Sequence, residues 1–445
     1  MSKIIIIGSN HAGTAAINTI LDNYKNEEVV VYVRNDNISF LGCGMALWIG
    51  KQISTGDNLF YCTPQILQNK GSKVHMGAEV TAIDPESKTV KVKLNGEEIE
   101  DHYDKLILAT GSNPVTLNIP GKELENVQLV KLYQNAQSVI NKIEEDPSIE
   151  NVVVIGAGYL GVELAEAFQR LGKNVTLIDR EEHILSGNFD PEYGDRMAEN
   201  MKSNGIDIRL EESVLEFKGE KGKVSSVVTD KGTFPCEMVI SAAGFTPNSS
   251  LGGEAFDRFK NVAYLVNKRF ETSQKDVYAI GDCSTEYNNA IDDVDYIALA
   301  TNAVRSGIVA AHNACGTDIE SLGVQGSSAI SIFGYNMVSA GLTVAAAKKH
   351  NIDVSYTDFE DTQLPAFMEI DNPKVNIRIV YRKDNRVIVG AQLASNYDIS
   401  QQINLFSLAI QEKVTIDKLA LLDIFFLPHF DQPYNYITMA ALSAK

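Results

Sequence analysis

The chain contains the same local pattern twice, once at residues 4–33 and again at residues 152–179. Each copy has a short apolar run rich in isoleucine or valine, a glycine-rich loop, a helical stretch and a second apolar run. The loops are Gly8-Ser9-Asn10-His11-Ala12-Gly13 and Gly156-Ala157-Gly158-Tyr159-Leu160-Gly161. Glycines at these positions let the backbone approach a pyrophosphate, which then rests on the N-terminus of the following helix. Two copies predict an α/β chain with two Rossmann-like dinucleotide-binding domains.

The two copies differ in the residue that ends their second apolar run. In the later copy, Asp179 follows Gly156 by 23 residues. A carboxylate here accepts hydrogen bonds from the ribose hydroxyls and repels a 2′-phosphate, which favours NADH over NADPH. The neighbouring Arg180 acts in the opposite direction, because an arginine can contact a phosphate. We expect NADH to be preferred.

The earlier copy lacks such a carboxylate. Val33 stands at the matching position, Arg34 follows it, and Asn10 replaces the middle glycine of the loop. A ribose bound here would be held by backbone amides or by Arg34, unless Asp36 reaches back to it. We therefore expect this loop to retain its dinucleotide less tightly than is usual for such a fold.

Two further strand ends have the chemistry of cofactor contacts. The apolar run 106–108 leads into Ala109-Thr110-Gly111-Ser112, and the run 277–280 leads into Gly281-Asp282. Small residues permit close backbone approach, and a carboxylate accepts hydrogen bonds from sugar hydroxyls. Either segment could be an ordinary strand-end turn. Their order around the second nucleotide unit favours contacts with the dinucleotide of the first.

Size and charge exclude several classes of protein. At 445 residues the chain has room for two or three domains. A net charge of −19 argues against nucleic acid or an anionic membrane as partner. No apolar run approaches the ~20 residues of a membrane helix, and the first residues do not resemble a signal peptide. Five scattered cysteines fit a reducing cytoplasm.

The last third of the chain has a different pattern. Alternating apolar residues at 375–381 predict a half-buried strand, residues 387–390 begin a return strand, and 399–410 carry a helical stripe. Residues 423–430 are dense in aromatic side chains. They could belong to a core, or to a subunit interface if they are exposed.

Cys43 is the strongest candidate for chemistry. It lies in Ser39-Phe40-Leu41-Gly42-Cys43-Gly44, and no other cysteine lies within six residues of it. A lone cysteine is often a small buried hydrophobe, but its place after the first glycine loop favours a redox role. A thiol without a nearby partner can cycle between thiolate and sulfenic acid rather than form a disulfide. The other cysteines, which have no such context, are Cys62, Cys236, Cys283 and Cys315.

The ordered motifs resemble the pyridine nucleotide–disulfide oxidoreductase family, in its single-cysteine branch, over essentially the whole chain. Within that branch the chain is most similar to water-forming NADH oxidases. Particular marks are Asn10-His11-Ala12-Gly13, residues 42–48, residues 300–305 and residues 425–430. The resemblance implies a discontinuous FAD-binding domain (1–117 and 246–320), an NAD-binding domain (118–245) and a C-terminal α+β dimerisation domain (321–445).

The resemblance also implies site residues. Cys43 would be the redox-active cysteine and His11 the acid/base beside it, although a histidine there could simply cap the helix. Contacts with FAD would come from Gly8, Asn10, Ala12, Gly13, Arg34, Val80, Thr110, Gly111, Ser112, Lys131, Leu160, Gly281, Asp282, Leu299, Ala300, Thr301 and, from the other subunit of a homodimer or dimer of dimers, Phe425. Contacts with NAD would come from Gly156, Gly158, Tyr159, Gly161, Asp179, Gly244 and Ala329. No metal site is expected.

The implied reaction is the reduction of O₂ to water by NADH through FAD and Cys43. Three positions depart from the family pattern: Val33 replaces an acid, Ala329 replaces a glycine, and Val304 replaces an arginine found near the cysteine of NADH peroxidase. The last difference favours an oxidase. The alternatives are an NADH peroxidase that reduces H₂O₂, a coenzyme A-disulfide reductase, and a flavin-binding redox sensor.

Overall fold

Each glycine loop lies at the carboxyl end of the central strand of a five-stranded parallel sheet. The computed structural model describes residues 2–445. In the first sheet the strand order is β18-β7-β1-β2-β3, and all neighbours are parallel. Ile4, Ile5 and Ile6 are fully buried, as expected for a strand covered on both faces. The strands are β1 (Ser2–Ile7), β2 (Glu27–Val33), β3 (Lys73–Met76), β7 (Lys105–Leu108) and β18 (Val277–Ala279).

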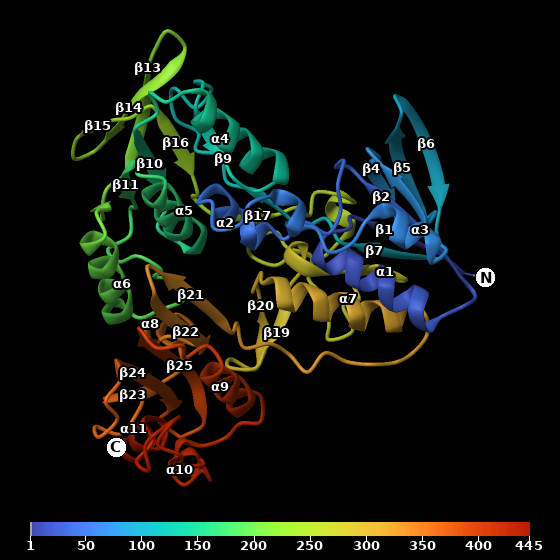
Figure 1. Ribbon diagram of the computed structural model, residues 1–445. Helices are drawn as coiled ribbons and strands as arrows, with labels where there is room; N and C mark the ends of the chain where they lie inside the picture. The colour runs from blue at the N-terminus through green and yellow to red at the C-terminus, as the bar shows by residue number, and fades with distance from the viewer. Residues whose placement is uncertain (1) are drawn as a thin grey trace.

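Two helices lie side by side beneath this sheet (Figure 1). They are α1 (His11–Asn23) and α7 (Ala300–Ala314). Gly307 permits their close approach, because a Cβ there would lie 2.3 Å from the carbonyl oxygen of Ala12. Residues about 290 apart in the sequence therefore meet beside the first glycine loop.

The second sheet repeats the first. Its order is β12-β11-β10-β16-β9, again with all neighbours parallel. The predicted α/β class with two Rossmann-like units is confirmed. The strands are β9 (Val127–Leu129), β10 (Asn151–Ile155), β11 (Asn174–Ile178), β12 (Asp207–Arg209) and β16 (Met238–Ser241); the helices are α4 (Tyr133–Glu145), α5 (Tyr159–Arg170) and α6 (Pro191–Ser203).

The repeat extends beyond what the glycine loops indicate. In each unit a three-stranded antiparallel sheet is inserted in the chain before the parallel sheet is complete, between β3 and β7 in the first unit and between β12 and β16 in the second. Many residues of these small sheets are exposed, and their sequences carry a weak apolar signal. They are β4 (Glu79–Asp84), β5 (Thr89–Leu94) and β6 (Glu97–His102) in the first unit, and β13 (Val214–Glu220), β14 (Lys223–Thr229) and β15 (Thr233–Pro235) in the second.

The Cys43 segment joins the two units. It contains a 3₁₀ turn (Gly42–Gly44), α2 (Met45–Ile49), a second 3₁₀ turn (Gly56–Leu59) and α3 (Pro64–Asn69). Helix α2 packs on α5 of the second unit. A Cβ on Gly50 would lie 3.1 Å from the Cα of Ala167, so this contact requires a very small residue. A second link is the antiparallel pair β8 (Ser112–Pro114) and β17 (Phe245–Pro247).

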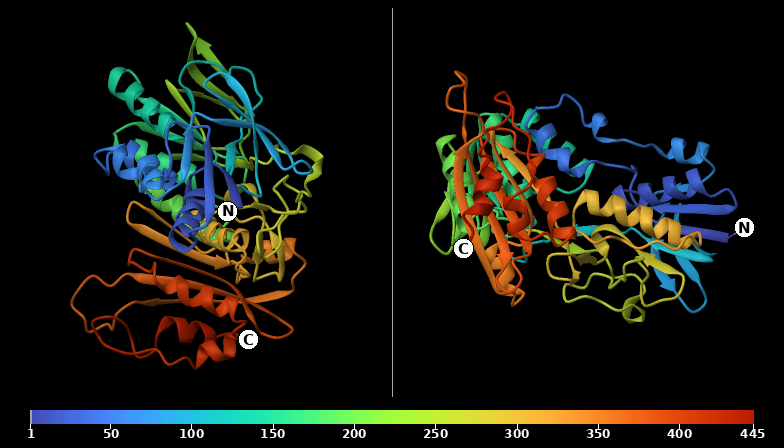
Figure 2. Two further views of the ribbon diagram at one scale, coloured as in Figure 1. Left: turned by 90° about the vertical axis from the view of Figure 1, so that its right-hand side faces the viewer. Right: turned by 90° about the horizontal axis from the view of Figure 1, so that it is seen from below.

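The C-terminal unit is an antiparallel sheet in the order β21-β22-β25-β24-β23. The predicted strands at 375–381 and 387–390 and the helix at 399–410 correspond to β24, β25 and α9. Figures 1 and 2 show this unit at one end of the molecule, away from β1. Its elements are β21 (Ser328–Ile332), β22 (Tyr335–Gly341), β23 (Val354–Thr362), β24 (Lys374–Arg382), β25 (Ile388–Ser395), α8 (Val344–Lys349), α9 (Gln402–Gln411), α10 (Ile416–Ala420) and α11 (Tyr436–Leu442), and it is preceded by the hairpin β19 (Glu286–Asn288) and β20 (Asp293–Asp295).

The aromatic segment between α10 and α11 is exposed in the single chain. Leu421 is 84% exposed and Phe425 67% exposed. Exposed apolar side chains gathered on one segment are typical of an interface. No helix within residues 2–445 is both long and apolar enough to cross a membrane. The predicted domain boundaries, at 117/118, 245/246 and 320/321, stay a proposal.

Candidate active site

The glycine loops are built so that only glycine fits at their ends. Gly8 has φ +96°, and a Cβ on it would lie 2.3 Å from the carbonyl oxygen of Ala109. A Cβ on Gly13 would lie 2.1 Å from the Gly8 oxygen. In the second loop, Gly156 (φ +102°) and Gly161 have the same relation to Ala242 and to Gly156. In each unit the glycine loop, the start of the helix after it and the turn after the neighbouring strand (β7 or β16) are thus packed as tightly as a pyrophosphate site requires.

The middle positions differ between the loops. A Cβ on Gly158 would meet nothing within 4 Å, so the start of α5 faces open space. In the first loop Asn10 is exposed at the start of α1, and its Oδ1 accepts a hydrogen bond of 2.8 Å from the backbone N–H of Phe40. The replacement of glycine by asparagine therefore ties the first loop to the Cys43 segment. Both helix starts retain unbonded N–H groups that fit a dinucleotide phosphate.

Asp179 ends β11 as predicted and is held against the second glycine loop. Its Oδ2 accepts a hydrogen bond from the backbone N–H of Ala157 at 2.5 Å, and its Oδ1 accepts one from Glu181 at 2.9 Å. The equivalent place in the first unit has no such group. The Oδ1 of Asp36, the alternative carboxylate, accepts a hydrogen bond from Gln134.

A polar cluster joins the predicted contacts at residues 112, 131 and 282. Ser112 Oγ donates to Asp282 Oδ2 at 2.8 Å, and Lys131 Nζ donates to Ser112 Oγ at 2.9 Å. Lys131 also lies 4.3 Å from the centre of the Phe245 ring. Gly281 (φ +68°) sits against Ala12, where a Cβ would come within 2.9 Å of the Ala12 methyl group. Strand ends far apart in sequence thus converge on the first glycine loop.

Cys43 is exposed and lies at the centre of the 3₁₀ turn Gly42–Gly44. The preceding segment is held by the chain around residue 60: Leu41 donates its N–H to the Leu59 oxygen at 2.8 Å, and Ser39 Oγ donates to the Cys62 oxygen at 2.7 Å. Ser39 adopts a left-handed conformation (φ 57°), and its N–H donates to the Ser9 oxygen at 2.8 Å. The cysteine is therefore displayed from a loop fixed to the first glycine loop.

The protein groups around Cys43 raise the pKa of its thiol and so disfavour the thiolate. Partial burial raises its pKa, a backbone N–H offsets this in part, and the Glu163 carboxylate raises it further. Helix α2 begins at Met45 and has only five residues.

His11 begins α1 as predicted and is paired with a residue that sequence patterns did not reveal. Its Nδ1 lies 3.1 Å from the hydroxyl of Tyr61, and the two rings stack with centroids 5.8 Å apart. Burial lowers the pKa of His11, which Asp282 partly offsets. Burial also raises the pKa of Tyr61 to about 12, so that its hydroxyl keeps its proton. His11 is therefore a neutral imidazole at pH 7 with one nitrogen already engaged.

The second glycine loop meets the C-terminal unit at Tyr159. The Tyr159 hydroxyl donates to Ser328 Oγ at 2.8 Å, next to the predicted contact Ala329. One turn along α5 lies Glu163, whose pKa is raised to about 7 by burial and by the neighbouring Glu166. A Cβ on Gly244 (φ +104°) would meet nothing within 4 Å, which leaves room for a ligand beside the loop. Leu160 is half-buried at the start of the same helix.

The remaining predicted contacts lie on several separate elements. Arg34 is exposed, 4.0 Å from Glu79, and Val80 is buried in β4. Leu299, Ala300 and Thr301 form the start of α7, beside the Gly281–Cys283 turn. Thr110 Oγ1 donates to the Asn248 oxygen at 2.5 Å, and Gly111 (φ +71°) faces open space. Phe425 lies on the exposed aromatic segment of the C-terminal unit and contacts Phe430.

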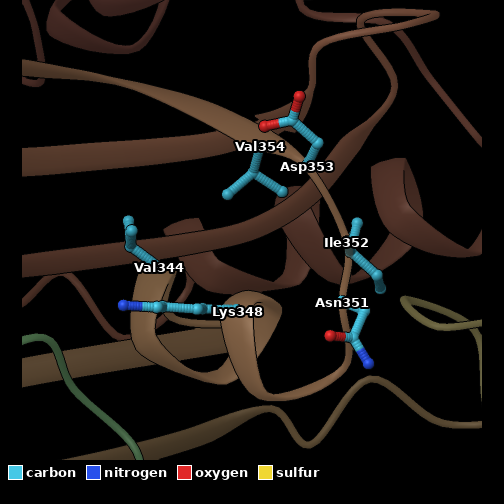
Figure 3. A pocket seen from close by; sticks show the side chains of 6 residues that line it. All are labelled: Val344, Lys348, Asn351, Ile352, Asp353 and Val354. Atoms are coloured by element: carbon cyan, nitrogen blue, oxygen red, sulfur yellow. The ribbon is translucent and has the colours of Figure 1, made fainter.

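The other cysteines form no disulfide with Cys43 or with one another. Cys62, Cys236 and Cys283 are buried, and burial raises the pKa of each. Across residues 2–445 there is no group of three His, Cys, Asp or Glu side chains that could hold a metal ion. A surface hollow lined by Val344, Lys348, Asn351, Ile352, Asp353 and Val354 (Figure 3) contains none of the predicted site residues.

Two dinucleotide loops that converge on one exposed cysteine define a two-nucleotide oxidoreductase. Residues 2–307 match the pyridine nucleotide-disulphide oxidoreductase family, and residues 327–435 match its dimerisation domain. The chain belongs to the pyridine nucleotide-disulphide oxidoreductase family.

The chain is similar to several NADH oxidases along its whole length. It is 55% identical over 457 residues to an NADH oxidase of Streptococcus pyogenes and 50% identical over 446 residues to one of Lactococcus lactis, with 100% of each chain covered. Among solved structures, a water-forming NADH oxidase from Lactobacillus brevis bound to NADH has 37% identity and a TM-score of 0.96. That likeness covers 100% of this chain and 98% of the other.

Proposed function

We propose that the chain is an FAD-dependent NADH oxidase that reduces O₂ to water: 2 NADH + O₂ + 2 H⁺ → 2 NAD⁺ + 2 H₂O. The observation that carries the proposal is the position of Cys43, which no second cysteine accompanies. Its segment is hydrogen-bonded to one dinucleotide loop through Asn10 and packed, through α2, on the helix that starts at the other loop. The names of the full-length relatives support the same reaction.

The first unit fits FAD. The loop from Gly8 to Gly13 would hold the pyrophosphate, and Asp282, Ser112 and Lys131 would bind the remaining polar atoms on the same side. When bound, FAD would carry electron pairs from NADH to the oxygen substrate and to Cys43. The wider contact set is Asn10, Ala12, Arg34, Val80, Thr110, Gly111, Leu160, Gly281, Leu299, Ala300 and Thr301. The lack of a carboxylate at Val33 predicts that added FAD increases activity.

The second unit fits NADH. Gly156, Gly158 and Gly161 would receive the pyrophosphate, and Asp179 would accept hydrogen bonds from the adenosine ribose. Tyr159, Gly244 and Ala329 would line the path toward the nicotinamide. Because Asp179 is anchored to the loop itself, its carboxylate is fixed before the nucleotide arrives.

Cys43 would reduce the peroxide that forms from the first NADH. Its thiolate attacks one oxygen of H₂O₂, the O–O bond breaks, and the products are Cys43 sulfenic acid and hydroxide, which takes up a proton to become water. The two electrons of a second NADH return the sulfenic acid to thiolate and release the second water. The thiolate, not the thiol, is the nucleophile, so the raised pKa of Cys43 must be offset in the loaded enzyme.

His11 would pass a proton to the departing hydroxide. If the Tyr61 hydroxyl donates to Nδ1, the neutral ring carries its proton on Nε2. Nε2 would release that proton as Nδ1 takes one from the Tyr61 hydroxyl, and solvent would then reprotonate Tyr61. General acid help of this kind contributes about 10²–10⁴ in rate. Tyr61 and the start of α1 would set the direction of that nitrogen.

We also propose that the enzyme works as a homodimer or a dimer of dimers. The dimerisation-domain match and the exposed segment around Phe425 support this proposal. In the dimer, Phe425 of one subunit would cover the FAD of the other.

The test is the ratio of NADH to O₂ consumed by the purified protein, with and without added FAD. The proposal predicts two NADH per O₂ and no free H₂O₂. Oxidation of NADH that requires added peroxide would instead establish an NADH peroxidase and refute the proposal.

A further inference from the structure

The turn that carries Cys43 is short and has a glycine on each side. Neither Gly42 nor Gly44 has a side chain that could anchor the turn, and Cys43 is itself exposed. Glycine allows many backbone conformations, so three such residues do not fix the direction of a thiol by themselves. That direction depends on the two arms of the turn, which are residues 39–41 before it and helix α2 after it.

One aromatic ring contacts both arms. Phe40 in the first arm is 3% exposed, and Trp48 in the second arm is 7% exposed. The ring of Tyr133 stacks on Trp48, with the ring centres 5.0 Å apart and 16° between the planes. The same ring meets Phe40 edge-on, with the centres 5.8 Å apart. Both arrangements are favourable for aromatic pairs, so the two arms share one support.

Tyr133 also contacts the segment that carries Tyr61. The ring of Phe60 lies 5.1 Å from that of Tyr133 and 5.5 Å from that of Phe40, measured between centres. Tyr61 follows Phe60 in the chain, and its hydroxyl engages His11. Tyr133 therefore supports both the Cys43 turn and the segment that engages the proposed proton donor.

This support comes from the second nucleotide unit. Tyr133 is the first residue of α4, and α4 contacts α2 (Figure 1). Two residues earlier, Lys131 donates to Ser112 in the polar cluster beside the first glycine loop. Trp48 is confined at Gly56 as well, where a Cβ would lie 2.6 Å from its ring. The start of α4 is thus anchored close to the ring, and the stacked Trp48 has little room to turn.

We infer that Tyr133 is a positioning residue for Cys43, because its ring joins the two arms of the turn and so sets the direction of the thiol. It acts through Phe40 and Trp48 rather than on the reacting atoms. A displacement of about 1 Å at a reacting group can cost about 10²-fold in rate. The ring carries this role, since the hydroxyl makes a long contact of 3.5 Å with Gln137. The inference rests on the proposed function, which assigns peroxide reduction to Cys43.

The experiment uses the FAD-loaded protein and separates two steps by rapid mixing without O₂. The first step is reduction of the flavin by NADH, and the second is oxidation of Cys43 by H₂O₂ in the reduced protein. We expect Tyr133→Leu to slow the second step roughly tenfold to a hundredfold and to leave the first unchanged. Tyr133→Phe keeps the ring and should keep both rates.

The matched control is Phe256→Leu. It removes one ring of a buried aromatic pair in the first unit, where Phe256 and Tyr264 lie 5.3 Å apart, and it should keep both rates. Trp48 is the single tryptophan of the chain, so its fluorescence reports on the second arm. Quenching of this fluorescence by acrylamide should increase in Tyr133→Leu and not in the other two variants.

Trp48→Leu removes the stack from its other side and should slow the peroxide step in the same way, which also serves if Tyr133→Leu does not fold. A normal peroxide rate in these variants, an equal loss in Tyr133→Phe or Phe256→Leu, or equal slowing of both steps would overturn the inference. Failure of the proposed function is distinct. It would appear in the unmodified protein as a ratio of NADH to O₂ other than two, while the peroxide rates of the variants could still be compared.

Discussion

The side-chain Oδ1 of Asn10 accepts a hydrogen bond from the backbone N–H of Phe40 at 2.8 Å. This bond joins the first glycine loop to the segment that displays Cys43. A second bond, from the Ser39 N–H to the Ser9 oxygen, runs beside it. The position of the Cys43 segment relative to the first glycine loop is thus held by two adjacent contacts, one of which depends on a side chain.

The first prediction concerns this bond. Asn10→Ala should loosen the Cys43 segment, because it leaves the Phe40 N–H without its partner at a cost of about 1 kcal/mol. We expect the fraction of NADH oxidation that releases free H₂O₂ to rise severalfold. The measurement is H₂O₂ formed per NADH. Asn23→Ala, on the exposed end of the same helix, is the control, and an equal release of peroxide from both variants would contradict the role of Asn10.

A second prediction concerns the pair of His11 and Tyr61. Tyr61→Phe removes the hydroxyl that engages Nδ1, so the imidazole can adopt either tautomer and loses the contact that orients it. We expect the reaction of reduced enzyme with H₂O₂ to slow by about tenfold, within the range for general acid help. Tyr133→Phe removes a hydroxyl that makes only a 3.5 Å contact and should leave the rate unchanged. A normal rate in Tyr61→Phe would show that Tyr61 does not assist His11 in this step.

A third prediction concerns the pH dependence of Cys43. Burial and the Glu163 carboxylate both raise the pKa of the thiol. The pKa of Glu163 is about 7, so its charge is present mainly above that pH. Glu163→Gln removes the charge and should lower the pKa of Cys43. The alkylation rate of the reduced protein, followed against pH, should therefore rise at a lower pH than in the unmodified chain.

The control for this experiment is Glu144→Gln, which removes an exposed carboxylate paired with Lys51. Its alkylation profile should match that of the unmodified protein. An unchanged profile in Glu163→Gln would mean that the Glu163 charge does not raise the pKa of Cys43, and an upward shift would contradict the expected direction.

A fourth prediction concerns the junction between the second unit and the C-terminal sheet. Arg378 is 5% exposed, lies 3.3 Å from the buried Asp190, and forms paired hydrogen bonds with Glu192 and Asp358. Arg378→Met leaves Asp190 without its cation and should cost about 3 kcal/mol of unfolding free energy.

Arg386→Met removes a comparable but more exposed contact with Asp417 and should cost less than about 1 kcal/mol. Urea denaturation of both variants compares the two losses. Equal losses would show that burial of Arg378 adds nothing to stability.

Much of the frame could be predicted from the sequence. The glycine loops, the buried strands beside them, Asp179, and the strands and helix of the last third have strong local patterns, and the structure contains them. The small antiparallel sheets and the edge strand β9 were not predicted. They are short, and their pairing depends on partners that are distant in the chain.

The same limit applies to the candidate site. Cys43 and His11 stand out because of their position after and within a glycine loop. Tyr61 and Glu163 do not, because each reaches the site from a separate element and neither belongs to a local motif. The cluster of Ser112, Lys131 and Asp282 likewise joins three strand or loop ends that only the fold brings together.

In the proposed function, Cys43 converts peroxide to water within the enzyme. The most direct test is Cys43→Ser, with NADH, O₂ and H₂O₂ followed together in the presence of added FAD. Serine keeps the size of the side chain but cannot form a sulfenic acid. We expect one NADH per O₂ with stoichiometric release of H₂O₂, against two NADH per O₂ and no peroxide for the unmodified protein. A variant that still forms only water would contradict the role proposed for Cys43.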